Sequence, residues 1–177
     1  NLEKMLGKAL EKLHLFFLFT TLCVLTYDED ENALRFAPST LGFYKIENPL
    51  YTNQQSFPLS GKSIACMVAL ESLKTGLPAE QNVANVGSNP NYLPLIPKTT
   101  SELCVSLMSS EKKLLGVLVL ERSERSFDDD DVELVEMVAR QLSLGMERAT
   151  QNENLDFQST VAAAYVWAAD LAHDINH

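Results

Sequence analysis

The chain of 177 residues has the size of one domain plus a short additional element, and its 46% hydrophobic content suffices for a packed core. The 14 basic and 24 acidic residues give a formal net charge of −10, which repels phosphate backbones and argues against nucleic acid as a partner. Three widely spaced cysteines indicate neither a disulfide framework nor a zinc knuckle, and they fit a reducing cytoplasm. The most apolar run, 13–25, is too short for a membrane span. Because the chain begins with Asn, we expect it to be a fragment of a longer protein.

The first third of the chain predicts a helix and a β-hairpin. Apolar residues from Leu2 to Leu13 recur at helical spacing, which is typical of an amphipathic helix. Thr, Val, Leu and Tyr are abundant in 19–27, and the polar turn "DEDEN" separates this run from "ALRFA". Residues 38–56 contain two prolines and no regular pattern.

The segment "FPLSGKSIACMVALESLKTG" predicts a short strand followed by a helix. We expect Ser60 to cap this helix and Gly76 to end it. The connection from 77 to 100 is long and polar, with one expected short strand at "QNVANV". Loops of this length are usually functional or mobile.

Two β-rich runs, 102–108 and 113–121, flank the polar "SSEK" and predict a second hairpin. Both runs are apolar on both faces, so we expect helices on both sides of the sheet. The following "FDDDDVELV" predicts a helix start in which Asp128 is the N-cap and Asp131 reaches back to it. A cation site is the alternative, although consecutive aspartates on a helix point in different directions.

These last segments resemble the closing strand and helix of a GAF domain, a small-molecule sensor module. The resemblance rests on Gly116 inside the last strand and on Phe127 before the acidic helix start, and it covers about residues 1–150. It implies an α+β fold: an antiparallel five- or six-stranded sheet between helices, with a ligand cleft on one face and a long C-terminal signalling helix. We expect the helix at 61–75 and the loop "NPNYLPLIP" to close the cleft.

The resemblance leaves the ligand and the cofactor unknown. The expected ligand contacts are Cys66, Tyr92, Cys104 and Ser106. No cysteine precedes a histidine, which disfavours a bilin, and the cyclic-nucleotide signature of GAF domains is missing. No metal site is predicted, although an iron–sulfur cluster on the three cysteines is an alternative. A methionine sulfoxide reductase of this fold is a second alternative, and a structural module without a ligand is a third.

The closing helix is predicted to continue beyond the sensor domain. Apolar residues recur at steps of three and four from 135 to 149 and again, in a different phase, from 157 to 175. Such a stripe packs against a second copy of itself. We therefore expect a homodimer in which the opening helix and the helix from about 128 supply the contact.

The final segment, "LAHDINH", resembles the H-box of sensor histidine kinases. The resemblance implies that His173 is the phosphoacceptor and Asp174 its neighbouring acid, on the helix face away from the apolar stripe. It makes 151–177 a linker helix and the beginning of the phosphoacceptor region. The ATP-binding kinase domain and the response regulator would belong to a cytoplasmic parent protein, and this fragment alone would be inactive.

Overall fold

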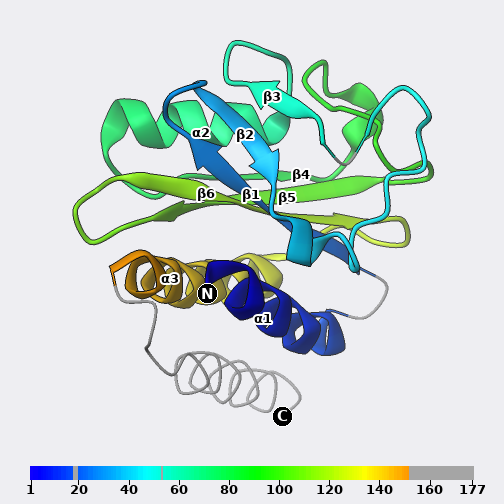
Figure 1. Ribbon diagram of the computed structural model, residues 1–177. Helices are drawn as coiled ribbons and strands as arrows, with labels where there is room; N and C mark the ends of the chain where they lie inside the picture. Colours follow the sequence, from blue (N-terminus) through cyan, green and yellow to red (C-terminus); the bar gives the residue numbers. More distant parts are fainter. Residues whose placement is uncertain (18–19, 53, 152–177) are drawn as a thin grey trace.

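The computed structural model describes residues 1–17, 20–52 and 54–151, and it has three layers. One six-stranded sheet lies between α2 on one face and α1 with α3 on the other (Figure 1). The strand order is β3-β2-β1-β6-β5-β4, and all neighbouring strands are antiparallel. The expected α+β fold is therefore confirmed, with six strands. Within the described residues no helix is both long and apolar enough to cross a bilayer.

The elements follow the predicted order. The helices are α1 (Leu2–Phe16), α2 (Ile64–Thr75) and α3 (Asp129–Gln151), and two short 3-10 turns lie at Pro38–Thr40 and Val86–Ser88. The strands are β1 (Thr20–Asp28), β2 (Ala33–Phe36), β3 (Ser56–Pro58), β4 (Glu80–Val83), β5 (Ser101–Met108) and β6 (Leu114–Arg122). The two predicted hairpins are β1–β2 and β5–β6.

The apolar stripes of α1 and α3 are buried together against one face of the sheet. Leu6 and Leu10 of α1 and Val135 of α3 belong to a single core with Leu103 and Leu107 of β5. The prediction that the opening and closing helices pair on this face is confirmed. That they also join two copies of the chain stays a prediction.

The start of α2 differs from the prediction. Ser63, rather than Ser60, is the N-cap, and its hydroxyl accepts a hydrogen bond from the Cys66 amide at 3.4 Å. Ser60 lies in a turn that the Gly61 amide closes onto the Pro58 carbonyl at 2.8 Å, so the helix can begin only after that turn. The predicted end is confirmed, because Gly76 stops α2 with a left-handed φ of +67°.

Gly116 allows β6 to approach β1 closely. A Cβ at this position would collide with the carbonyl oxygen of Leu25 and lie 3.1 Å from its carbonyl carbon. Gly116 pairs with Thr26 of β1 and with Leu107 of β5, beside the irregular step at Met108. A side chain here would therefore push the central strands apart.

Candidate functional site

The face of the sheet beneath α2 encloses a cavity of about 20 Å³. Its walls are mostly aromatic and aliphatic, with contributions from β1, β2, β3, the start of α2 and the loop before β5. Two carboxyl groups, Glu102 and Glu121, complete the lining. A volume of this size holds about one water molecule. This cavity lies on the face where the GAF resemblance implies a ligand cleft, and the protein's own side chains nearly fill it.

Glu102 of β5 and Glu121 of β6 are directly opposite each other in the antiparallel pair. Their exposed fractions are only 6% and 2%. Burial raises the pKa of Glu102 to about 7 and raises the pKa of Glu121 well above its usual value. Two like charges at this separation cannot both be ionised in an apolar pocket. The pair therefore shares a proton near neutral pH.

The hydrogen bonds around the pair indicate which carboxyl keeps the proton. The Cys104 thiol lies 3.0 Å from Oε1 of Glu102 and donates to it. That bond, and a second one from Glu121, favour ionisation of Glu102. Glu121 is the main holder of the shared proton, because burial and the charge of Glu102 raise its pKa more than the hydrogen bonds with Tyr44 and Thr99 lower it.

Two irregular segments meet to form the roof of the cavity beside α2. The carbonyl oxygen of Leu95 accepts from the amides of Glu47 and Asn48 at 3.1 and 3.2 Å. Nδ2 of Asn48 also donates to the carbonyl of Pro94 at 2.8 Å. This confirms the prediction that the loop "NPNYLPLIP" packs over this face.

None of the four expected ligand residues lines this cavity, and three of them are engaged in other hydrogen bonds. The Cys66 thiol donates to the carbonyls at the end of β3, and the Tyr92 hydroxyl donates to the Ile96 carbonyl. The Ser106 hydroxyl oxygen accepts from the Ser72 hydroxyl of α2 at 2.7 Å and from the Ala79 amide, between α2 and β4, at 2.8 Å. Their role in ligand binding stays a prediction.

Cys104, the fourth expected residue, reaches the cavity only through its partner Glu102. The sequence analysis missed both glutamates. A usable signal was present, because Glu102 alternates with Cys104 along β5 and so points to the same face.

The three cysteines do not meet. Cys23 and Cys104 both lie opposite Val119, on the two strands that flank β6. All three are buried, and burial raises the pKa of each thiol, which suppresses the reactive thiolate. No group of three potential metal ligands comes together among the described residues, which leaves the iron–sulfur alternative without a site there.

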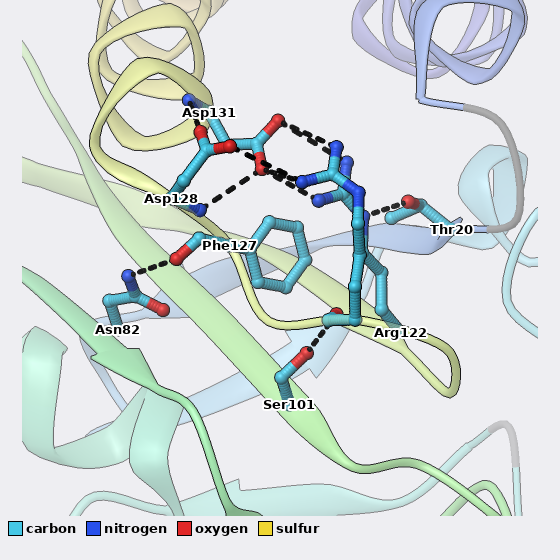
Figure 2. A network of polar contacts seen from close by, with 8 residues as sticks. Thr20, Asn82, Ser101, Arg122, Phe127, Asp128 and Asp131 are labelled. Carbon is cyan, nitrogen blue, oxygen red and sulfur yellow. Dashed lines mark hydrogen bonds and ion pairs between the residues drawn. The ribbon is translucent and has the colours of Figure 1, made fainter.

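Arg122, the residue after Glu121, connects the sheet to α3 (Figure 2). Its guanidinium lies 2.7 Å from Asp131, donates to the Thr20 hydroxyl at 2.8 Å and stacks 4.2 Å from the centre of the Phe127 ring. Because neighbouring residues of a strand point to opposite faces, one strand end contributes both to the cavity and to the start of α3.

The aspartates before α3 form the predicted helix cap. The Asp131 amide donates to Asp128 Oδ1 at 2.9 Å, and the Asp128 amide donates back to Asp131 Oδ2 at 3.1 Å. Partial burial acts against ionisation of Asp131, but hydrogen bonds from Arg122 and Asp128 and the charge of Arg125 outweigh it and lower its pKa. The reciprocal cap is confirmed.

His173 and Asp174, the predicted phosphoacceptor and its neighbouring acid, lie outside the described residues.

The sequence matches the GAF domain model over residues 1–146, and the chain belongs to this family of sensory and regulatory domains. No curated protein matches it significantly. The fold is similar to that of free methionine-R-sulfoxide reductase from Neisseria meningitidis, solved with its substrate. The TM-score is 0.68 at 20% identity, covering 85% of this chain and 81% of that chain.

Two further solved structures are similar. The GAF domain of an Acinetobacter phosphoenolpyruvate-protein phosphotransferase has a TM-score of 0.64 at 17% identity, over 88% of this chain and 87% of that chain. A type II free methionine-R-sulfoxide reductase from Thermoplasma acidophilum has a TM-score of 0.61 at 14% identity, over 81% and 94%. Identities this low establish likeness of fold alone.

Proposed function

We propose that this chain is the sensory input domain of a sensor histidine kinase, and that the cavity beneath α2 binds a small ligand carrying a protonated amine. The supporting observation is the Glu102–Glu121 pair, buried in an otherwise apolar cavity. Apolar residues of similar volume at such positions are often neutral or stabilising, so folding gives no reason for the pair.

The chemistry of the pair favours a cation with N–H donors. An ammonium group that displaces the shared proton would give both carboxylates an opposite charge and charge-assisted hydrogen bonds. A cavity of about 20 Å³ cannot hold such a ligand beside the present side chains. Entry therefore requires the roof contacts of Leu95 with Glu47 and Asn48 to open.

The output of the sensor would run through α3. Binding at Glu121 moves the end of β6, and Arg122 passes that movement to the cap of α3. In the parent protein the helix would continue to His173, which would accept a phosphoryl group from ATP with Asp174 as the neighbouring acid. A dimer through the terminal helices would place this histidine beside the kinase domain, and the response regulator would be the final acceptor.

Ligand binding is tested by native mass spectrometry of the purified chain and by thermal shift with small primary amines. Each amine is paired with its uncharged N-acetyl derivative. We expect the amines to raise Tm and the acetylated compounds to have no effect. Glu121→Gln should abolish the Tm shift. Glu111→Gln is the control and should preserve it, because Glu111 is exposed in the β5–β6 turn, at the end of the hairpin away from the carboxyl pair. Equal shifts from amines and acetylated compounds would refute the amine site.

The kinase assignment is tested by joining the natural downstream region and supplying ATP. An acid-labile phosphoryl adduct should form on His173, disappear in His173→Gln and persist in His177→Gln. Labelling that persists without His173 would show that this helix has no phosphoacceptor role.

Two observations support other functions. The fold shared with sulfoxide reductases, together with a cysteine beside the cavity carboxylates, makes a thiol-dependent reductase the second candidate, and such a reductase would have to expose the buried Cys104 thiol. Turnover of methionine-R-sulfoxide with dithiothreitol, lost in Cys104→Ser, would establish that activity. The small cavity favours a structural module without a ligand, and that function would be supported if no compound shifts Tm.

A further inference from the structure

The outward face of α2 carries large apolar side chains that no described part of the chain covers. They lie at steps of three and four along the helix and into the turn after it, and so share one side. They are Met67, Leu70, Leu73 and Leu77, with exposed fractions of 38%, 44%, 43% and 58%. We call these four residues the α2 stripe.

The inward face of the same helix is already fixed to the sheet. Ala65, Val68 and Ala69 are fully buried there, and the Ser72 hydroxyl donates to Ser106 of β5. α2 is thus apolar on both sides, which is typical of a helix that is covered on both sides. Figure 1 shows α2 on the face of the sheet opposite α1 and α3, with no other α-helix beside it.

The opposite helical layer is different. The exposed positions of α1 are mainly charged, as at Lys4, Lys8 and Glu11. Large exposed apolar residues of that layer, Leu15 and Leu144, lie on separate helices. The α2 stripe is therefore a local feature and requires its own explanation.

We propose that the α2 stripe binds the α2 stripe of a second copy, with the two helices antiparallel. If a two-fold axis passes beside residue 72, each residue n lies opposite about residue 144 − n of the partner helix. Met67 then lies opposite Leu77 of the partner subunit, and Leu70 lies opposite the partner's Leu73. The stripe is complementary to itself, as an isologous interface requires.

The flanking charges support the same arrangement. Glu71 and Lys74 are both exposed on one flank of the stripe. Antiparallel pairing places Glu71 opposite the partner's Lys74, and the symmetry repeats this pair. A parallel arrangement would place these two residues on opposite sides of the helix pair, where the two charges could not meet.

The contact is small, and its affinity should be low. The helix has 12 residues, which at 1.5 Å per residue gives about 18 Å of length. Interfaces of this size lie at the weak end of specific association. Because α2 and the terminal helices lie on opposite faces of the sheet, the α2 contact can also join two dimers formed elsewhere (Figure 1). Two linked contacts would strengthen such an assembly.

Sedimentation velocity of the whole chain over a range of concentrations tests the proposal. A doubling of mass is expected as concentration rises. Leu70→Glu should remove that step, because it places two carboxylates at the centre of the contact. Leu50→Glu alters a more exposed leucine, 82% against 44% for Leu70, that lies away from the stripe, and it should leave the step intact. Absence of the step in the unaltered chain, or equal effects of both variants, would overturn the proposal.

Charge reversal gives a second test that is independent of apolar contact. Glu71→Lys and Lys74→Glu should each weaken association about tenfold, since two attractive pairs become repulsive. The double variant, Glu71→Lys with Lys74→Glu, should restore affinity to within about threefold of the original. A double variant as weak as the single variants would exclude the antiparallel register.

Discussion

At the scale of single residues, the end of β6 connects the proposed ligand cavity with the proposed output helix α3. Glu121 contributes to the cavity beneath α2, and Arg122 holds the cap of α3 on the other face. Arg122 is 5% exposed and its partner Asp131 is largely covered, so the ion pair is shielded from water. A shielded pair loses more when one partner is removed than an exposed pair does.

Arg122→Met should lower the free energy of unfolding by about 3 kcal/mol, because Asp131 would lose its closest opposite charge. Arg125→Met is the matched control: Arg125 also pairs with Asp131, but its side chain is 58% exposed. Its cost should stay within about 0.5 kcal/mol. Urea denaturation of the three proteins measures both. Equal losses in the two variants would mean that burial of Arg122 is unimportant.

The buried carboxyl pair predicts a stability that depends on pH. A carboxyl group in an unfolded chain has a pKa of about 4.3, whereas burial raises the pKa of Glu102 to about 7 and that of Glu121 well above its usual value. The folded protein therefore binds more protons than the unfolded chain between these values. The contribution of this pair to the free energy of unfolding is therefore fully present below about pH 4.3, and it is lost as pH rises through 7.

Glu121→Gln should flatten this fall, because Glu102 would no longer face a second carboxyl. Thermal unfolding from pH 4.5 to 8 is the measurement. Asp131, whose pKa is lowered, acts in the opposite direction: its contribution is lost only as pH falls below the usual carboxyl range, outside this interval. Parallel pH profiles for the original protein and the variant would contradict the shared-proton pair.

At the scale of elements, the pairing of β1 with β6 depends on a missing side chain. Gly116→Ala should destabilise the fold by about 2–3 kcal/mol, because the new methyl group collides with the backbone of Leu25. Relieving that collision would require moving a paired central strand. Gly42→Ala is the control, since nothing lies within 4 Å of the added Cβ. It should change stability by less than about 1 kcal/mol. Chemical denaturation that finds the two variants alike would refute the close approach.

Local patterns predicted most elements, because helices and hairpins are encoded by nearby residues. For this reason the sequence predicted the reciprocal cap of Asp128 and Asp131 and the end of α2 at Gly76. Ser60 misled the prediction because a turn onto Pro58 intervenes before the helix. Such a turn depends on β3, which gives a weak signal of three residues.

The site was less predictable, because it is built from contacts between distant segments. Glu102 and Glu121 meet through the register of β5 with β6, and the irregular step between Leu107 and Met108 shifts that register from the one counted back from the turn. The roof joins Asn48 to Pro94 across 46 residues of chain. The GAF resemblance implies a cleft on the face beneath α2, but which residues line the cavity there follows from packing.

At the scale of the whole molecule, the sheet separates two apolar cores. One core lies between the sheet and the α1–α3 layer, and the other lies beneath α2. The central strands β1 and β6 border both cores and are paired on both edges. The described residues of the roof segments, 38–52, 54–55 and 84–100, contain no strand, and the two segments are joined by hydrogen bonds of Leu95 and Pro94 with Glu47 and Asn48. Local opening should therefore begin at the roof.

Native-state hydrogen exchange should resolve this order. The amides of Glu47 and Asn48 should exchange at a free energy several kcal/mol below that of β1 and β6, which need global unfolding. Leu95→Ala removes one buried side chain of the roof and should accelerate these two amides further, with a cost of about 2–3 kcal/mol. Leu144→Ala, at an exposed position of α3, is the control and should leave them unchanged. If Leu95→Ala accelerated the amides of β6 as much as those of the roof, the roof would unfold only together with the sheet. The cavity would then have no local route for a ligand to enter.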